Sequence, residues 1–97
     1  MAIAFVRDIP GVTPEGYDAV VAEIGLDEEP AAGLIVHTAG MFNGVWREID
    51  VWESREAWDT FNRERIWPAV QRAMGDQAPT TPPPAEEIMD VYDLIQP

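Results

Sequence analysis

The chain contains no cysteine. Disulfide bonds, thiolate nucleophiles and zinc–thiolate centres are therefore excluded. Basic residues are also scarce, because six of them stand against eighteen acidic residues and give a formal net charge of −12. A surface this negative repels phosphate backbones and anionic lipid headgroups, so we expect neither a nucleic acid nor a membrane among the partners.

Long hydrophobic runs are missing as well. The longest apolar stretches, Ala2–Val6 and Gly33–Val36, are too short for a signal peptide or a membrane span, and we expect a cytoplasmic protein. The sequence has no glycine-rich phosphate loop, no HExxH pair and no EF-hand spacing, and its acidic stretch 26–32 is typical of a solvated connection. No metal and no other cofactor is predicted.

The composition that remains is that of an ordinary globular protein, with 46% hydrophobic and 25% charged residues. A length of 97 residues corresponds to one domain, residues 1–97, since domains usually hold ~100–200 residues. The fold and any site must therefore share a single small core.

Short apolar segments bounded by turn residues predict the strands. They are Ala2–Val6, Gly33–Ala39, Val45–Glu53 and Glu87–Ile95. The second and third are separated by a short glycine-bounded loop, residues 40–44, which is typical of a hairpin. A proline-rich, extended connection, residues 76–86, precedes the last strand.

Two helices are predicted from their capping residues. Thr13 provides an N-cap and Gly25 a C-cap for the first helix, whose apolar residues recur at three-and-four spacing. Ser54 caps the second helix, which we expect to kink just before Pro68 and to end at Gly75.

The order strand, helix, strand, strand, helix, strand is that of the split βαβ arrangement. We therefore predict an α+β, ferredoxin-like fold in which a four-stranded antiparallel sheet carries both helices on one face. The strands are apolar on both faces, as Ile49 and Val51 opposite Trp46 and Trp52 illustrate. Two helices cover only one face, so we predict a homodimer that packs sheet against sheet.

One face of the third strand combines carboxylates with indoles. The two-residue period of a strand places Trp46, Glu48, Asp50 and Trp52 on the same side. Desolvation by indoles and mutual repulsion raise the pKa of a carboxyl group, so Glu48 and Asp50 are candidate catalytic bases and the two tryptophans candidate substrate contacts. The alternative is that the tryptophans are ordinary core residues and that the carboxylates meet water.

Other side chains can complete the same site. Trp58, one turn into the second helix, can form a stacking wall for a flat ligand, or it is a core aromatic residue. Asn62 and Arg65 follow on its side of the helix and can bind a substrate oxygen, or Arg65 pairs with the carboxylates of the third strand. Tyr92 presents its phenol to the cavity, or it packs against the sheet.

His37 is the only histidine, within the second strand. It is a candidate general base, and a hydrogen-bonded structural histidine is the alternative. Without cysteine, a neighbouring serine or a second histidine, it forms neither a nucleophilic triad nor a multi-histidine metal site. Its face relative to Glu48 depends on the register of the hairpin.

Residues 50–58, DVWESREAW, lie at the junction of the third strand and the second helix. They resemble the V-W-E-S-x-E-A-[FW] signature of the antibiotic biosynthesis monooxygenase-like (ABM) members of the dimeric α/β-barrel superfamily. The element order agrees with that family over the whole chain. Gly33–Ala39, the pair Trp46 and Arg47, and the run Ile66–Gly75 are similar to a group of small bacterial proteins within the superfamily.

This resemblance implies a homodimer with a ligand cavity between the sheet and the helices of each protomer. Trp52 matches the motif tryptophan that lines it, and Trp58 takes the aromatic place of the motif in the helix. In the family's cofactor-free oxygenases, deprotonation of a polycyclic phenol allows the resulting carbanion to react with oxygen. Glu48 stands where the quinone-forming type has asparagine, and Asn62 stands where the haem-degrading branch has its iron-binding histidine, so haem chemistry is not implied.

The leading hypothesis is a small cytoplasmic enzyme that acts on a flat aromatic or polyketide-like metabolite. Glu48 or His37 would abstract a proton, and oxygenation or cyclisation would follow without a metal or flavin. The alternatives are a non-catalytic, small-molecule-binding or stress-associated barrel and an assembly module that docks through its acidic exterior.

Overall fold

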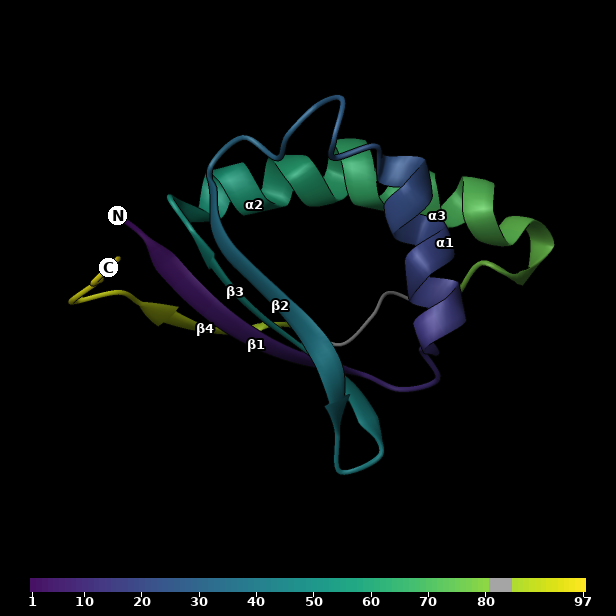
Figure 1. The fold of residues 1–97 in the computed structure, drawn as a ribbon, viewed down its shortest axis with the longest axis horizontal. Coiled ribbons are helices and arrows are strands. Elements are labelled where there is room, and N and C mark those ends of the chain that lie inside the picture. The colour runs from purple at the N-terminus through teal and green to yellow at the C-terminus, as the bar shows by residue number, and fades with distance from the viewer. Residues whose placement is uncertain (81–84) are drawn as a thin grey trace.

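The computed structural model describes residues 1–80 and 85–97. Four strands form one antiparallel sheet in the order β2-β3-β1-β4 (Figure 1). Their bounds are Ile3–Ile9 for β1, Leu34–Phe42 for β2, Val45–Trp52 for β3 and Glu87–Asp90 for β4. The strand β2 is therefore at one edge of the sheet, and β4 is at the other.

The helices lie on one face of this sheet (Figure 1). They are α1, Pro14–Ile24, and a second helical segment composed of α2, Arg55–Phe61, a π-helical turn, Asn62–Ile66, and α3, Trp67–Met74. A 3₁₀ turn, Gly75–Gln77, follows. This arrangement confirms the α+β, ferredoxin-like fold.

Both predicted N-caps are formed. The Thr13 hydroxyl accepts a hydrogen bond from the Gly16 amide at 3.1 Å, and the Ser54 hydroxyl accepts one from the Ala57 amide at 3.1 Å. Each satisfies an amide that has no partner within its helix. Gly25 ends α1 with a φ of 70°, a conformation that glycine adopts without strain.

The second helical segment changes its hydrogen-bonding pattern where proline was expected to disturb it. The Trp67 amide donates to the Asn62 carbonyl, five residues earlier, instead of the usual four. Pro68 then lies in the first turn of α3, where an amide proton is not needed. The predicted interruption is thus a π-helical turn before Pro68, and it adds one residue to the helical path.

The hairpin between β2 and β3 is tighter than expected. The strand β2 extends to Phe42, into the predicted five-residue loop, while β3 begins at Val45 as predicted. Only Asn43 and Gly44 remain as the turn, with φ of 51° and 81°. Two successive left-handed residues suit the right-handed twist of a hairpin. This turn fixes the register and places His37 directly opposite Asp50.

The last strand is shorter than predicted. The sequence pattern indicated Glu87–Ile95, but β4 ends at Asp90. Its neighbour β1 begins at Ile3, which pairs with Asp90, and the Val91 amide makes the final bond to the Ala2 carbonyl at 2.9 Å. The pairing of β4 with β1 ends there. Of the predicted connection 76–86, residues 81–84 lie outside the described residues.

The core lies between the sheet and α2. Its buried residues are Ile3, Phe5, Trp52 and Trp58. The Trp52 and Trp58 rings are 5.4 Å apart between centroids and tilted, and Phe5 is 4.7 Å from Trp58. Such tilted contacts are favourable for aromatic rings beyond the burial of their area. The two tryptophans of the DVWESREAW segment thus join the sheet to the helix.

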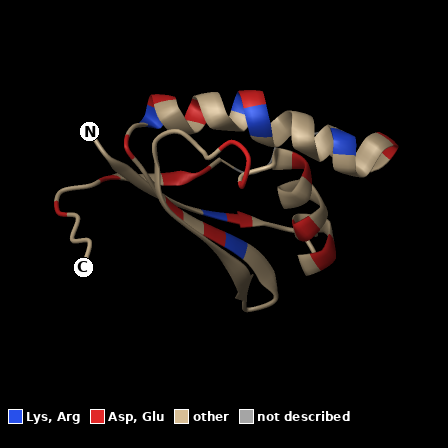
Figure 2. Ribbon diagram, turned by 45° about the horizontal axis from the view of Figure 1, so that its top comes forward, with Lys and Arg blue, Asp and Glu red and all other residues tan. Residues whose placement is uncertain are grey.

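In the part of the chain that the structure describes, no helix lies on the opposite face of the sheet (Figure 1). Exposed apolar side chains on it are Val36, Phe42, Ile49 and Met89. Acidic residues are distributed over strands, helices and loops, with far fewer basic ones among them (Figure 2). The prediction that both faces of the sheet are apolar is therefore met in this chain.

Gly33 lets the loop before β2 approach α2. Its φ is 88°, its carbonyl accepts a hydrogen bond from the Glu53 amide at 2.7 Å, and an added Cβ would lie 2.6 Å from the Ala57 Cβ. We expect Gly33→Ala to lower the free energy of unfolding by about 2–4 kcal/mol, from left-handed strain and from the clash. Urea denaturation measures this loss.

Gly44→Ala is the matched control, since Gly44 has a φ of 81° and open space around its Cβ position. It should lose only the strain, about 1–2 kcal/mol. Equal losses in the two variants would contradict the close approach between Gly33 and α2.

Candidate active site

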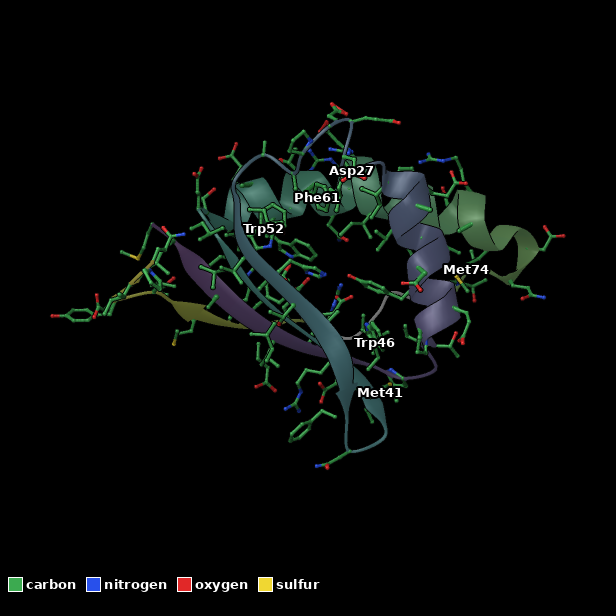
Figure 3. All side chains as sticks on the ribbon, in the orientation of Figure 1. Asp27, Met41, Trp46, Trp52, Phe61 and Met74 are labelled. Atoms are coloured by element: carbon green, nitrogen blue, oxygen red, sulfur yellow. The ribbon has the colours of Figure 1, made fainter. Side chains whose placement is uncertain are left out.

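A cavity of about 710 Å³ lies between the sheet and the helices. Apolar side chains of α1 and α3 form much of its wall, including Val20, Ile24 and Val70. Figure 3 shows Trp52 and Phe61 beneath α2 and Met74 beside α1 and α3, and all three line the cavity. This volume suits a ligand of a few fused rings, since small-molecule sites usually span ~300–1,000 Å³.

Three side chains from three elements form a hydrogen-bonded line at this cavity. The Tyr17 hydroxyl of α1 is 2.5 Å from Nε2 of His37 on β2, and Nδ1 of His37 is 2.6 Å from Oδ1 of Asp50 on β3. The second carboxylate oxygen of Asp50 accepts a bond from Nε1 of Trp52 at 3.0 Å. We call Tyr17, His37 and Asp50 the Tyr–His–Asp line.

The charges around this line shift two pKa values. The hydrogen bond to Asp50 raises the pKa of His37, and the negative charges of Asp50 and Glu48 act in the same direction against the effect of burial. Burial raises the pKa of Tyr17 to about 12, with further contributions from Glu48, Asp50 and Asp18. At neutral pH the Tyr17 phenol therefore keeps its proton.

A second polar cluster lies beside the first. The Arg7 guanidinium is 2.9 Å from Glu48 and 3.6 Å from Glu86 and is only 6% exposed. Nε1 of Trp58 donates to Glu86 at 2.9 Å, and Arg7 lies over the Trp58 ring at 5.4 Å. The carboxylates Glu48 and Asp50 thus have separate partners, and Glu48 is held by an ion pair.

Six of the predicted site residues line the cavity. They are His37, Glu48, Asp50, Trp52, Trp58 and Asn62. Trp46 shares their face of β3 but lies behind Tyr17, whose ring centroid is 4.9 Å away, and it is buried without lining the cavity. The two-residue period of β3 therefore placed Glu48, Asp50 and Trp52 on the side that faces the cavity. It also included Trp46, which does not line the cavity.

Arg65 does not face the cavity. Its guanidinium donates to the carbonyls of Ile24 at 2.9 Å and Glu29 at 2.7 Å, in the loop after α1. The π-helical turn is the physical reason, because its extra residue turns the following side chains by about 100° and brings Ile66 to the cavity instead. The predicted substrate contact by Arg65 is thus replaced by a structural one.

Tyr92 also lies away from the cavity. It follows the end of β4 and is fully exposed. The short β4 explains this, since the residues after Asp90 leave the sheet before Tyr92 can pack on it. Within this chain, Tyr92 contributes nothing to the cavity.

Two residues of the site were not predicted. They are Tyr17 of α1 and Arg7 of β1. Arg7 lies directly opposite Glu48 in the sheet, so the pairing of β1 with β3 was the missing information. For Tyr17, the available signal was its place on the same helix face as Val20 and Ile24, which line the cavity.

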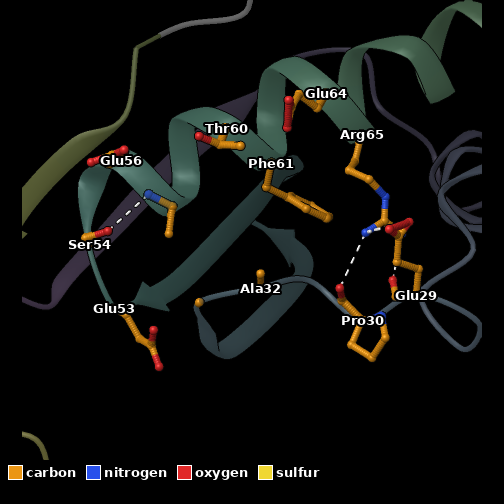
Figure 4. A pocket seen from close by; sticks show the side chains of 12 residues that line it. Glu29, Pro30, Ala32, Glu53, Ser54, Glu56, Thr60, Phe61, Glu64 and Arg65 are labelled. Atoms are coloured by element: carbon orange, nitrogen blue, oxygen red, sulfur yellow. Dashed lines mark hydrogen bonds and ion pairs between the residues drawn. The ribbon is translucent and has the colours of Figure 1, made fainter.

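A second, shallower hollow of about 450 Å³ lies between the loop before β2 and α2 (Figure 4). Glu53, Glu56 and Glu64 lie around it, and Arg65 spans it toward the Pro30 carbonyl.

Across residues 1–80 and 85–97, no group of three or more His, Cys, Asp or Glu residues could hold a metal ion. Nor does the described part of the chain contain a helix of the length and apolarity that a membrane span requires.

The chain matches no family model, and no curated protein matches it. Solved structures do match over nearly the full length. One is a putative antibiotic biosynthesis monooxygenase from Chloroflexus aurantiacus, at 15% identity and a TM-score of 0.61, covering 99% of this chain and 98% of that one.

Another is SnoaB from Streptomyces nogalater, a cofactor-independent oxygenase, at 15% identity and a TM-score of 0.57, covering 97% and 96% of the two chains. A third is Rv0793 from Mycobacterium tuberculosis, at 16% identity and a TM-score of 0.59, covering 98% of each. The chain thus has the ABM-like fold that the DVWESREAW segment suggested. At this level of identity the likeness concerns the fold alone.

The raised pKa of His37 makes stability depend on pH. Its contribution to the free energy of unfolding is complete below about pH 6.5, the ordinary pKa of the imidazole, and is lost as pH rises through the higher folded-state value. We expect wild type to lose stability relative to His37→Gln as pH rises from 6 to 9. Urea midpoints of both proteins across this range measure the change.

Glutamine is the appropriate comparison because its amide can still donate to Asp50 but does not titrate in this range. A difference between wild type and His37→Gln that stays constant with pH would contradict the bond from His37 to Asp50.

Proposed function

We propose that this chain is a small-molecule enzyme that binds a flat, largely apolar metabolite in the 710 Å³ cavity and removes a proton from it. The observation that carries the proposal is the Tyr–His–Asp line, in which three elements converge on an aromatic-walled cavity. Proton transfer needs a base within hydrogen-bond reach of the group it acts on and a third group that orients the base, and this line provides both.

Geometry assigns the order of the groups. Asp50 accepts from Nδ1 of His37, so neutral His37 presents an unprotonated Nε2, and Tyr17 occupies it. The ligand therefore meets Tyr17 first. As Tyr17 takes a proton from the ligand, its own proton passes to Nε2, and Asp50 stabilises the imidazolium that forms.

This order changes the roles expected from the sequence. His37 and Asp50 remain in the machinery, as the proton acceptor behind Tyr17 and its positioning group. Glu48 is ion-paired with Arg7 at 2.9 Å, so it shapes the cavity floor rather than acting as the first base. Trp52 and Trp58 provide the walls against which a flat ring system can lie.

The electron pair left on the ligand carbon can react in two ways. It can attack an electrophilic carbon of the same ligand and close a ring. It can also react with dioxygen, so that a CH₂ group becomes C=O while the second oxygen atom leaves as water with the two hydrogens. Both outcomes agree with an aromatic or polyketide-like metabolite, and the cofactor-independent activity named for SnoaB supports the second.

The test is turnover of anthrone, a flat tricyclic ketone with an acidic CH₂ group, followed by oxygen uptake and product absorbance. Relative to wild type, Tyr17→Phe and His37→Gln should lower kcat by about 10²–10⁴, the usual share of general acid–base catalysis, while anthrone still binds. Tyr92→Phe is the matched control, since Tyr92 is fully exposed, and it should keep full activity.

Full activity in Tyr17→Phe would overturn the relay. Tight binding of anthrone by wild type without turnover would instead favour the alternative, a non-catalytic binding protein. We expect the enzyme to act in the cytoplasm, as its cysteine-free, acidic sequence suggests.

We further propose that a second copy of the chain covers the outer face of the sheet. The support is the exposed apolar set Val36, Phe42, Ile49 and Met89 on the face that the helices leave open. Burying such a face against its twin removes it from water and uses the commonest oligomeric symmetry.

Light scattering after size exclusion tests the dimer. Wild type should have twice the 10.8 kDa mass of one chain, and Ile49→Asp should have the mass of a single chain, because the new charge would be buried unpaired. Ala19→Asp, on an exposed position of α1, should leave the dimer intact. A wild-type particle of 10.8 kDa at micromolar concentration would overturn the proposal.

A further inference from the structure

The hydroxyl of Tyr17 has a single proton. The protonation state of His37 determines the direction in which this O–H bond points. Asp50 is a carboxylate and accepts, so Nδ1 of His37 carries a proton in every state. When His37 is neutral, Nε2 is an acceptor and Tyr17 donates to it across 2.5 Å. When His37 is protonated, Nε2 donates to the same oxygen, and the Tyr17 proton must turn away.

The free direction leads into the cavity. Tyr17 lines it, and among the described residues the only side chain hydrogen-bonded to the Tyr17 hydroxyl is His37. A proton displaced from this bond therefore has the cavity's occupant as its acceptor. An aromatic wall on one side and the His37 bond on the other hold the phenol in place.

We propose that protonation of His37 turns the Tyr17 hydroxyl into a hydrogen-bond donor for a ligand carbonyl oxygen, so that the site selects flat ketones or quinones. This inference rests on the proposed function of the cavity and specifies the ligand class that it takes. In the protonated state Tyr17 polarises a carbonyl, and in the neutral state it accepts a proton from the carbon beside that carbonyl.

The charged groups around the Tyr–His–Asp line determine the pH at which His37 becomes protonated. Asp50 and Glu48 face His37 from β3, and Asp18 acts on Tyr17 from α1 itself. Arg7 of β1 is engaged with Glu48 at 2.9 Å. The arginines of the second helical segment bind the C-terminal end of α1. There Arg65 donates to the Ile24 carbonyl and Arg72 to Glu23.

Negative charge thus dominates the immediate surroundings of His37. The pKa of His37 is raised, mainly by its bond to Asp50, so the protonated form extends to higher pH than for a free imidazole. The carbonyl-binding state is therefore favoured toward acidic pH, and the proton-accepting state gains as pH rises through the raised pKa of His37.

The experiment compares two uncharged probes of the same shape, fluorenone and fluorene, which differ by one carbonyl oxygen. Their affinities are measured from pH 5.5 to 9 by equilibrium dialysis. Fluorenone should bind about three- to tenfold more tightly at the acidic end, the usual value of one net hydrogen bond, while the affinity of fluorene stays constant. Neither probe titrates, so the pH dependence belongs to the protein.

Variants locate the effect. Tyr17→Phe and His37→Gln should each remove the pH dependence for fluorenone, and Tyr92→Phe should retain it. Because the two equilibria are linked, saturating fluorenone should raise the pKa of His37 by about 0.5–1 unit, the same factor as the change in affinity. Proton NMR reads this directly, since the chain has only one histidine.

Parallel pH profiles for fluorenone and fluorene would overturn the inference, and so would a Tyr17→Phe variant that keeps the wild-type profile. Failure of both probes to bind at any pH would overturn it as well. Loss of anthrone turnover with an intact fluorenone profile would contradict only the proposed function, because binding is measured without catalysis. A fall in fluorenone affinity in Tyr17→Phe is counted only if its urea midpoint stays near that of wild type.

Discussion

The buried carboxylate of Asp50 is the constraint on which the site and much of the core depend. It is 3% exposed, and an ionised carboxylate at that depth needs partners. One oxygen accepts from Nδ1 of His37 and the other from Nε1 of Trp52. Asp50 thereby joins an edge strand to the central tryptophan of the core, and it also aims Nε2 of His37 at Tyr17. Removing either partner would leave a buried charge partly unsatisfied, so packing and chemistry are coupled at this residue.

Local periodicity predicted the parts of the structure that depend on one element at a time. The two-residue period of β3 placed Glu48, Asp50 and Trp52 on one face, and the capping pattern located both helices. The pairing between elements could not be predicted in this way. The face of the sheet on which His37 lies depended on whether the hairpin turn had two residues or five. The left-handed conformations at Asn43 and Gly44 produce a two-residue turn.

The departures have a common origin in backbone hydrogen bonds that side-chain patterns do not reveal. The closing strand stops at Asp90, where its pairing with β1 ends, and this leaves Tyr92 exposed. Arg65 leaves the cavity because the helix adds a residue in its π-helical turn. Tyr17 could not be assigned to the site, since nothing in its local sequence indicates the imidazole 20 residues later.

The π-helical turn has a consequence for comparing this chain with others of the same fold. Cavity residues before it, such as Trp58 and Phe61, and those after it, such as Val70 and Met74, belong to helical registers that differ by one position. Against a chain whose corresponding helix is α-helical throughout, an alignment drawn without a one-residue gap here would equate cavity-facing positions of this chain with positions that face elsewhere. At the 15–16% identity of the matched structures, gap placement in this helix therefore decides which helix positions are judged equivalent.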